Sequence, residues 1–295
     1  MVTFNKCLIT EGLMIRSIFT GASGMMVTME ELNTVANNLA NVNTDGYKKE
    51  TTVTKAFPEM LIRRLNDDGQ VKFPLGSYDL APVVGKLGTG VEFNESYTRF
   101  EQGSLMETSN DFDMALDGNG FFTVNTEEGE RYTRNGNFKI DNEGYLTDMH
   151  GNKLMGENGN ILLERNNFQV DKEGNVYENM DYKPGDFVDK TGNEWKNMTK
   201  IDRLKIVDFP ERRYLQKDGY TLYKESDFSG HAAIIDGNSR PQVHQGFIEK
   251  SNVDPVVEMT RMIEINRLYE ANQKVIQTAD DTLSKAVNQV GRGLA

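Results

Sequence analysis

Residue types that commonly carry catalysis or bind metals are few in this sequence and lie far apart. The three histidines, His150, His231 and His244, fall in different predicted turns or strands. None has a cysteine or carboxylate beside it at the spacing of a protein metal site. The single cysteine, Cys7, excludes an intramolecular disulfide. We therefore expect no catalytic site and no metal site, and we classify the chain as a protein that is not an enzyme.

Several turns share part of a ligand-binding pattern but lack the rest of it. The acidic turns 141–144 and 171–174 have neither the alternating oxygen ligands nor the closing glutamate of a calcium loop. The turn Gly118-Asn119-Gly120 leads into a predicted strand, so it offers no helix N-terminus to a phosphate. Residues 85–90 lack the Lys-Ser/Thr end of a P-loop. The sequence predicts hairpin turns at these places and no cofactor.

Charge and hydropathy exclude further classes of function. The 295-residue chain has a formal net charge of -12, which argues against a general nucleic-acid or anionic-membrane surface. It has no apolar run long enough to span a bilayer and no stretch with the pattern of a cleaved secretory signal. We expect neither nucleic-acid binding nor membrane insertion.

Two terminal segments repeat apolar or small residues every three or four positions, which is the pattern of a coiled-coil seam. The C-terminal seam consists of Met262, Ile265, Tyr269, Asn272, Ile276, Ala279, Leu283, Ala286 and Val290. The N-terminal seam consists of Ile15, Ile18, Ala22, Met25, Met29, Leu32, Ala36 and Leu39. Asn272 is the polar member of its seam, and such a residue commonly fixes helix register. The sequence predicts two helices that pair and leave surplus apolar surface for further partners.

The N-terminal helix is predicted over residues 14–46, with residues 1–13 as a tail or as a stretch before a true start at Met14. Gly21 and Gly24 should weaken it by about 1 kcal/mol each relative to alanine. Residues 41–46 should end the helix, because Gly46 can adopt a positive φ without a side-chain penalty. The β domain is expected far downstream, so Gly46 should direct the connecting chain without supporting that domain.

The middle of the chain is predicted to be β-rich. Residues 47–90 read as an extended connector with one short helix at 59–65. Residues 91–249 read as antiparallel strands, because short apolar runs alternate with turn residues. The predicted strands are 120–124, 137–140, 161–163, 168–170, 201–209 and 220–223, with a polar loop at 178–200. The C-terminal helix occupies 250–295, with Pro255 in its first turn. The predicted fold class is α+β: N- and C-terminal helices form a coiled-coil-like helical domain around a central all-β antiparallel domain.

Residues 36–48, with the sequence ANNLANVNTDGYK, resemble the N-terminal signature of the bacterial flagellar axial proteins, the rod and hook family. The matching residues are Asn37, Asn38, Leu39, Ala40, Asn41, Thr44, Gly46 and Tyr47. Four further stretches agree with the family in the same order: 20–25, 100–105, 132–136 and 246–253. The resemblance runs from Met14 over almost the whole chain.

The resemblance implies a structural subunit of the flagellar rod. Such a subunit leaves the cytoplasm unfolded through the flagellar type III export apparatus, without a cleaved signal peptide, and polymerises in the periplasmic space to transmit motor torque. Its partners would be other copies of itself and neighbouring rod and hook-family proteins. The seam residues of the terminal helices would then form the assembly interface.

Two alternatives remain open at this point. Residues 201–209 and the form of the C-terminal helix favour a proximal rod protein, whereas the length of the connector 55–90 fits a distal rod protein. Outside the family, the two helices could form the stalk of an adaptor that presents a ligand-binding β domain.

Overall fold

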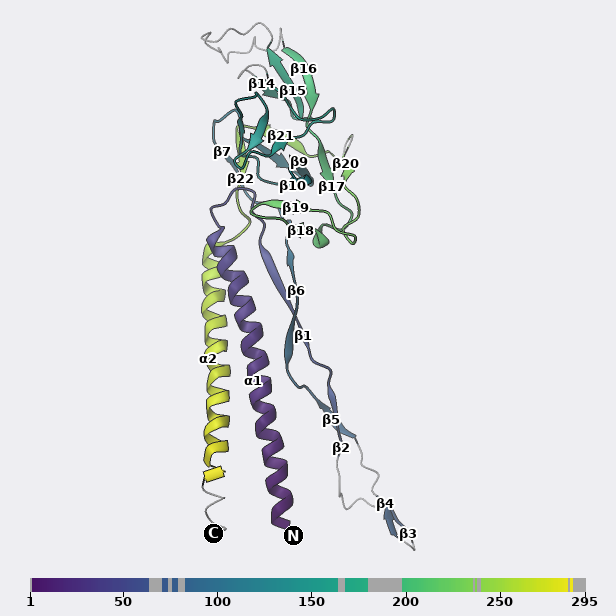
Figure 1. The fold of residues 1–295 in the computed structure, drawn as a ribbon, viewed down its shortest axis with the longest axis vertical. Coiled ribbons are helices and arrows are strands. Elements are labelled where there is room, and N and C mark those ends of the chain that lie inside the picture. Colours follow the sequence, from purple (N-terminus) through teal and green to yellow (C-terminus); the bar gives the residue numbers. More distant parts are fainter. Residues whose placement is uncertain are drawn as a thin grey trace. The chain divides into compact units, whose positions relative to one another are not determined.

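The chain divides into two compact units in the computed structural model. The helical unit comprises residues 1–37, 52–96 and 256–295, and the β unit comprises residues 38–51 and 97–255. Figure 1 shows the elements of both units. The structure describes residues 2–63, 71–73, 76–78, 83–163, 168–179, 198–235, 237, 240–285 and 287–288. Both units combine stretches that are distant in the sequence, so neither corresponds to one continuous segment.

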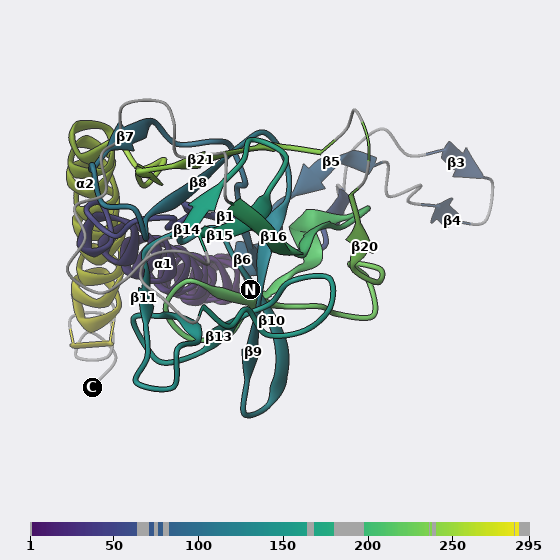
Figure 2. The ribbon, with the colours of Figure 1, turned by 90° about the horizontal axis from the view of Figure 1, so that it is seen from above.

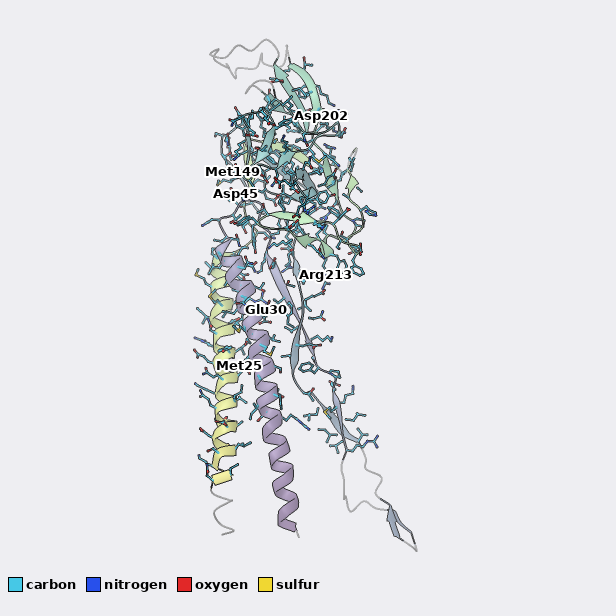
Figure 3. All side chains as sticks on the ribbon, viewed as in Figure 1. Met25, Glu30, Asp45, Met149, Asp202 and Arg213 are labelled. Carbon is cyan, nitrogen blue, oxygen red and sulfur yellow. The ribbon has the colours of Figure 1, made fainter. Side chains whose placement is uncertain are left out.

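Two long helices belong mainly to the helical unit. Helix α1 spans Val2–Ala40, and helix α2 spans Pro255–Lys285. The first begins at Val2 and not at the predicted position 14, because residues 2–13 contain no proline and an established helix extends at little cost. The second begins at Pro255, whose missing N–H is not needed in a first turn. Figure 3 shows side chains projecting from both helices, with Met25 and Glu30 labelled on α1.

Three two-stranded pairs lie in the described part of residues 50–98, whereas the sequence predicted an extended connector over residues 47–90 and antiparallel strands from residue 91 onward. Their strands are β1 (Glu50–Ala56), β2 (Met60–Arg63), β3 (Val71–Phe73), β4 (Gly76–Tyr78), β5 (Val83–Leu87) and β6 (Val91–Thr98). Strand β1 pairs with β6, β2 with β5, and β3 with β4. The predicted helix at 59–65 is wrong in its described part, because Leu61 pairs with Lys86 across β2 and β5. Cross-strand pairing overrides the local helix preference there.

The β unit contains a nine-stranded sheet in the part that the structure describes. Along the path β11-β12-β13-β9-β10-β19-β18, its strands are β11 (Phe138–Ile140), β12 (Leu146–Asp148), β13 (Lys153–Leu154), β9 (Phe121–Thr126), β10 (Gly129–Thr133), β19 (Leu222–Lys224) and β18 (Gln216–Lys217). Strand β17 (Ile206–Asp208) pairs with β9 and with β20 (Ala233–Ile234). Figure 2 shows β9 and β10 running side by side as a hairpin.

Smaller sheets complete this unit. Strands β14 (Phe168–Val170), β15 (Asn175–Asn179) and β16 (Met198–Arg203) form one antiparallel sheet. Strand β7 (Leu105–Glu107) pairs with β22 (Phe247–Glu249), and β8 (Met114–Asp117) pairs with β21 (Gln242–Gln245). A 3-10 helix, η2, spans Arg212–Tyr214.

The strand predictions succeed where a strand has a buried face and fail where the chain changes sheets. The runs 120–124, 137–140, 168–170 and 220–223 overlap β9, β11, β14 and β19. Residues 161–163 make only an isolated bridge, between Leu162 and Tyr145. The predicted strand 201–209 is broken, because β16 and β17 belong to different sheets. Most of the predicted loop 178–200 lies outside the described residues.

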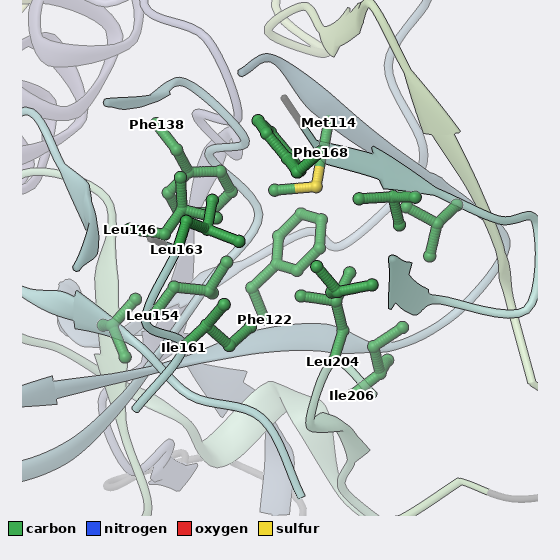
Figure 4. Packing of buried hydrophobic residues seen from close by; sticks show 14 of the residues in the cluster. Met114, Phe122, Phe138, Leu146, Leu154, Ile161, Leu163, Phe168, Leu204 and Ile206 are labelled. Carbon is green, nitrogen blue, oxygen red and sulfur yellow. The ribbon is translucent and has the colours of Figure 1, made fainter. Parts of the chain in front are cut away.

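Two apolar clusters stabilise the β unit. Phe121 and Phe122 are adjacent on β9 and fully buried, and they enter different clusters because successive side chains of a strand point to opposite faces. Figure 4 shows the larger cluster, in which Phe122 lies among residues from several strands. Its labelled members are Met114, Phe122, Phe138, Leu146, Leu154, Ile161, Leu163, Phe168, Leu204 and Ile206. The smaller cluster packs Phe121 with Tyr132, Val207, Phe209, Leu215 and Tyr223.

The smaller cluster predicts a loss of stability in alkali. Burial raises the pKa of Tyr132 to about 12 and also raises the pKa of Tyr223. The unfolded chain releases these protons at about pH 10. The stabilisation that comes from these buried, protonated tyrosines is therefore fully present below about pH 10. It is lost as the pH rises toward the pKa of the folded state. Between pH 10 and 12 the free energy of unfolding should fall by about 1–3 kcal/mol through Tyr132.

Denaturant unfolding measured at several pH values tests this expectation. Tyr132→Phe should flatten the alkaline decline. Tyr223→Phe should do the same at little cost at neutral pH, because the Tyr223 hydroxyl has no hydrogen-bond partner among the described residues. Tyr220→Phe is the control, because this ring is 75% exposed. An unchanged alkaline decline in the first two variants would contradict the assignment.

Candidate functional site: the helix faces and the polar junction

The two predicted helix seams lie close together at the glycines of α1. A Cβ atom added at Gly21 would lie 3.0 Å from Ile276 Cγ1, and one added at Gly24 would lie 2.8 Å from Asn272 Nδ2. The glycines that lower helix propensity therefore let α1 and α2 approach each other closely. Asn272, the polar residue of the C-terminal seam, lies opposite the second of them.

The buried face of α2 coincides with its predicted seam in the described residues. Ile265 and Ala279 are buried. The other described seam members are half-buried: Met262, Tyr269, Asn272, Ile276 and Leu283. The predicted members Ala286 and Val290 lie outside the residues whose side chains are described. A supercoiled pairing over the full helix length stays a prediction.

The buried face of α1 differs from its predicted seam. Five members of the predicted seam are half-buried: Ile18, Ala22, Met25, Leu32 and Leu39. The side chain of Ile15 is not described. Met29 and Ala36 are exposed. The buried positions are instead Gly21, Val27, Thr28, Val35 and Asn38, and all but Val27 lie one residue before a predicted member. The predicted seam left out Gly21 and Thr28, which carry no apolar signal, and it also left out the apolar Val27 and Val35.

A second candidate site lies in the β unit, where polar side chains from distant parts of the chain converge. We call it the polar junction and define it as residues 38–50, 99–103, 134–135 and 246–252. It contains a strap, residues 41–50, that follows α1. Hydrogen bonds and ion pairs attach the strap to residues more than 200 positions away in the sequence.

A buried ion pair lies at the centre of the polar junction. Lys48 Nζ is 2.5 Å from Glu249 Oε1, and both side chains are fully buried. The ammonium of Lys48 also donates to the carbonyl of Glu101 at 2.7 Å. Glu249 Oε1 accepts from the backbone N–H of Gly103 at 2.9 Å, and Glu249 Oε2 accepts from Arg134 at 3.4 Å. The carboxylate thus faces two cations and a backbone donor.

Burial changes the electrostatics of both cations. It lowers the pKa of Lys48 and the pKa of Arg134, while the Glu249 carboxylate opposes the change in each case. Removing charges from water costs several kcal/mol per ion unless partners compensate. The geometry supplies that compensation only when all the contacting segments are in place.

Asn38 attaches the strap to the last turn of α1. Its Oδ1 accepts from the backbone N–H of Glu50 at 2.9 Å and from the Tyr47 hydroxyl at 3.1 Å. Its Nδ2 donates to the Glu50 carbonyl at 2.9 Å. The side chain therefore pairs with both backbone groups of Glu50, as a neighbouring strand would. Asn38 is 1% exposed, so these bonds are sheltered from water.

Three further bonds join the strap to the segment before α2. Lys250 Nζ is 2.9 Å from Asp45 Oδ1. The backbone N–H of Lys49 donates to Asn252 Oδ1 at 2.8 Å, and Gly46 N–H donates to the Glu249 carbonyl at 2.7 Å. The end of α1 and the start of α2 are thereby connected through the β unit.

Gly46 has a positive φ of 69°, as predicted. It was also predicted not to contact the β domain, and here the structure differs. A Cβ atom at this position would lie 2.4 Å from the backbone nitrogen of Asn135. The expectation that the β domain begins far downstream is wrong, because the strap itself packs on residues 134 and 135. Only glycine fits both the backbone angle and the space.

The polar junction brings together most of the signature residues found in the sequence. Asn38, Gly46 and Tyr47 are buried; Leu39, Asn41 and Thr44 are half-buried; Asn37 and Ala40 are exposed. The central residues Lys48, Arg134 and Glu249 were not singled out by sequence reasoning. The signal was nevertheless present, because each lies inside one of the stretches that resemble the flagellar family.

The described residues contain no group of three or more histidine, cysteine, aspartate or glutamate side chains able to hold a metal. Among them, no helix is both long and apolar enough to cross a membrane.

Gly46→Val should destabilise the β unit. The substitution adds about 1–3 kcal/mol of backbone strain and also forces the strap away from Asn135. Gly219→Val is a matched control, because Gly219 has a φ of 82° and a Cβ atom added there would meet nothing within 4 Å. Calorimetry should show a clearly lower melting temperature for Gly46→Val than for Gly219→Val. Equal shifts would show that the contact with Asn135 contributes nothing.

Three family models match the chain, and each of them covers part of the polar junction. Residues 18–48 match the model described as "Flagella basal body rod protein", and residues 244–290 match "Flagellar basal body rod FlgEFG protein C-terminal". Residues 115–178 of the β unit match "Flagellar hook protein FlgE/F/G D1 domain".

Similar proteins extend the match to almost the full length. The chain is 33% identical to flagellar basal-body rod protein FlgG of Borreliella burgdorferi, over 93% of this chain and 98% of the relative. It is 30% identical to flagellar basal-body rod protein FlgF of Caulobacter vibrioides, over 94% and 98% respectively. It is 31% identical to flagellar hook-basal body complex protein FlhO of Bacillus subtilis, over 95% and 100%. The chain therefore belongs to the family of flagellar basal-body rod proteins, and it is a structural protein of the flagellar basal body.

Proposed function

We propose that this protein is a subunit of the flagellar rod that polymerises through its terminal helices and transmits motor torque. The observation that carries the proposal is the apolar surface left exposed on the helices. On α2 it comprises Val256, Val257, Met259, Ile263, Leu268 and Val275, each at least 46% exposed, and on α1 it comprises Phe19, Met26 and Met29. A water-soluble chain rarely exposes so much apolar surface unless a partner covers it.

Identical subunits in a helical array would cover these faces. A contact between two different faces of the same protein repeats without closing and so produces a filament. The partners would be other copies of this chain and neighbouring rod and hook-family proteins. The assembly interface would include the predicted seams together with the exposed residues of both helices. The chain would reach the periplasmic part of the basal body through the flagellar type III export apparatus, without a cleaved signal peptide.

Within the family, we propose the proximal part of the rod as the position of this subunit. The segment 201–209, which forms the end of β16 and strand β17, and the form of α2 support it. A distal position is the second candidate, and the observation favouring it is the long paired extension from β1 to β6.

Polar substitutions on the exposed face of α2 should block assembly without unfolding the monomer. Ile263 and Leu268 are each 55% exposed, so Ile263→Asn and Leu268→Asn should change monomer stability by only about 0.5 kcal/mol through helix propensity. Glu270→Asn is the control, because it alters an exposed polar position of the same helix. Motility of complemented deletion strains and calorimetry of the monomers measure the two effects. Motility equal to that of the control would refute the interface.

Imaging of basal bodies from a deletion strain tests the position of the subunit. A proximal subunit predicts that the rod is missing from its base. A rod that begins normally and stops short would favour the distal position instead. An intact rod in motile cells would exclude a rod subunit and favour the adaptor.

A further inference from the structure

Apart from the bonds of Asn38 to Tyr47 and Glu50, the strap is held by contacts with parts of the chain that are distant in the sequence. Lys48 and Glu249 are separated by 201 residues, Lys49 and Asn252 by 203, and Asp45 and Lys250 by 205. Bringing such distant segments together carries the entropy cost of closing a long loop. The local bonds to Asn38 do not bring the strap to residues 249–252, so its final position depends on long-range closure.

Both apolar clusters of the β unit are complete without the strap. The larger cluster and the hydrophobic residues packed on it come from residues 112–243. The smaller cluster and its partly buried neighbours come from residues 100–232. Burial of apolar surface, the main stabilising contribution to folding, is thus available to the β unit before residues 41–50 are attached.

The strap itself is attached mainly by polar contacts that depend on one another. Tyr47 is its one large apolar side chain that is fully buried. The Lys48–Glu249 pair is favourable only with its additional hydrogen bonds, to Glu101 and Gly103, and with Arg134 in place. A partly formed polar network in a buried place is less stable than either the complete network or the solvated groups. The strap should therefore be either closed or open, with no stable half-closed state.

We propose that the strap, residues 41–50, acts as a latch: it attaches last, onto a β unit whose two apolar clusters have already formed. The closed latch connects the end of α1 with the segment that leads into α2. The open latch leaves the clusters folded and the end of α1 unattached. The consequence of the latch for assembly rests on the proposed rod function. A subunit with an open latch would lack the bonds between the segment after α1 and the segment before α2.

Site-resolved hydrogen exchange on the full-length monomer tests the latch without any assembly. In pulse labelling during refolding, the latch amides of Gly46, Lys49 and Glu50 should become protected in a later phase than core amides. Leu146 and Leu204, whose N–H groups donate to Ile161 and Gly174, report on the core. Protection of both groups in one phase would overturn the proposal.

Variants separate the latch from the core at equilibrium. Glu249→Gln removes the negative charge between two buried cations, so protection of the latch amides should fall by about tenfold or more while protection of the core amides stays within about twofold. Asn38→Asp should give the same pattern by a different route, since it replaces the donor to the Glu50 carbonyl with a carboxylate oxygen. Glu127→Gln, at an exposed hairpin position, is the control and should change the protection of neither the latch amides nor the core amides.

Equal loss of protection in latch and core, or failure of both junction variants to fold, would show that the strap and the core form one cooperative unit. Because exchange is measured on the monomer, this result is independent of the motility and imaging results that decide the rod function.

Discussion

The polar junction depends above all on the buried ion pair between Lys48 and Glu249. Two charges without access to water destabilise a fold unless each meets partners at short range. Here those partners come from the strap, from residues 101–103 and from Arg134. Glu249 is itself positioned by pairing with Leu105 across β22 and β7. The charge requirement therefore contributes to fixing the relative positions of these segments.

The two units of the chain meet their stability requirements in different ways. The β unit buries large side chains from nine or more strands in two clusters of its described part, and it needs no second molecule to do so. The described part of α2 buries only Glu258, Ile265 and Ala279. A long helix with so few buried residues derives little stability from its own chain, because helical stability in proteins comes mostly from packing. This contrast agrees with the proposed function, in which the β unit is stable by itself and neighbouring subunits would cover the helices.

Sequence reasoning was most reliable where a single periodicity controlled the structure. The seam of α2 follows the heptad pattern, since Ile265 and Ala279 occupy predicted positions and are buried. The buried face of α1 lies mostly one residue before the predicted seam: Gly21 and Thr28 carry no apolar signal, and the apolar Val27 and Val35 were also left out. The pair β2–β5 was missed because its side chains are largely exposed on both faces and show no strict alternation. No pattern in a single sequence could join Lys48 to Glu249 across 201 residues. Only the resemblance to the flagellar family marked both stretches as important.

The distance along the chain between the two halves of the polar junction has a consequence for biosynthesis. A polypeptide that ends before residue 246 contains every residue of both apolar clusters, and its β unit keeps the main source of its folding energy. It lacks Glu249, Lys250 and Asn252, so the strap loses the carboxylate that pairs with Lys48, the ammonium that pairs with Asp45 and the acceptor of the Lys49 N–H. On the proposed order of folding, complete attachment of the strap therefore requires that translation has reached the C-terminal segment. A chain that ends before residue 246 would differ from a complete one at residues 41–50, far in sequence from the point at which it ended.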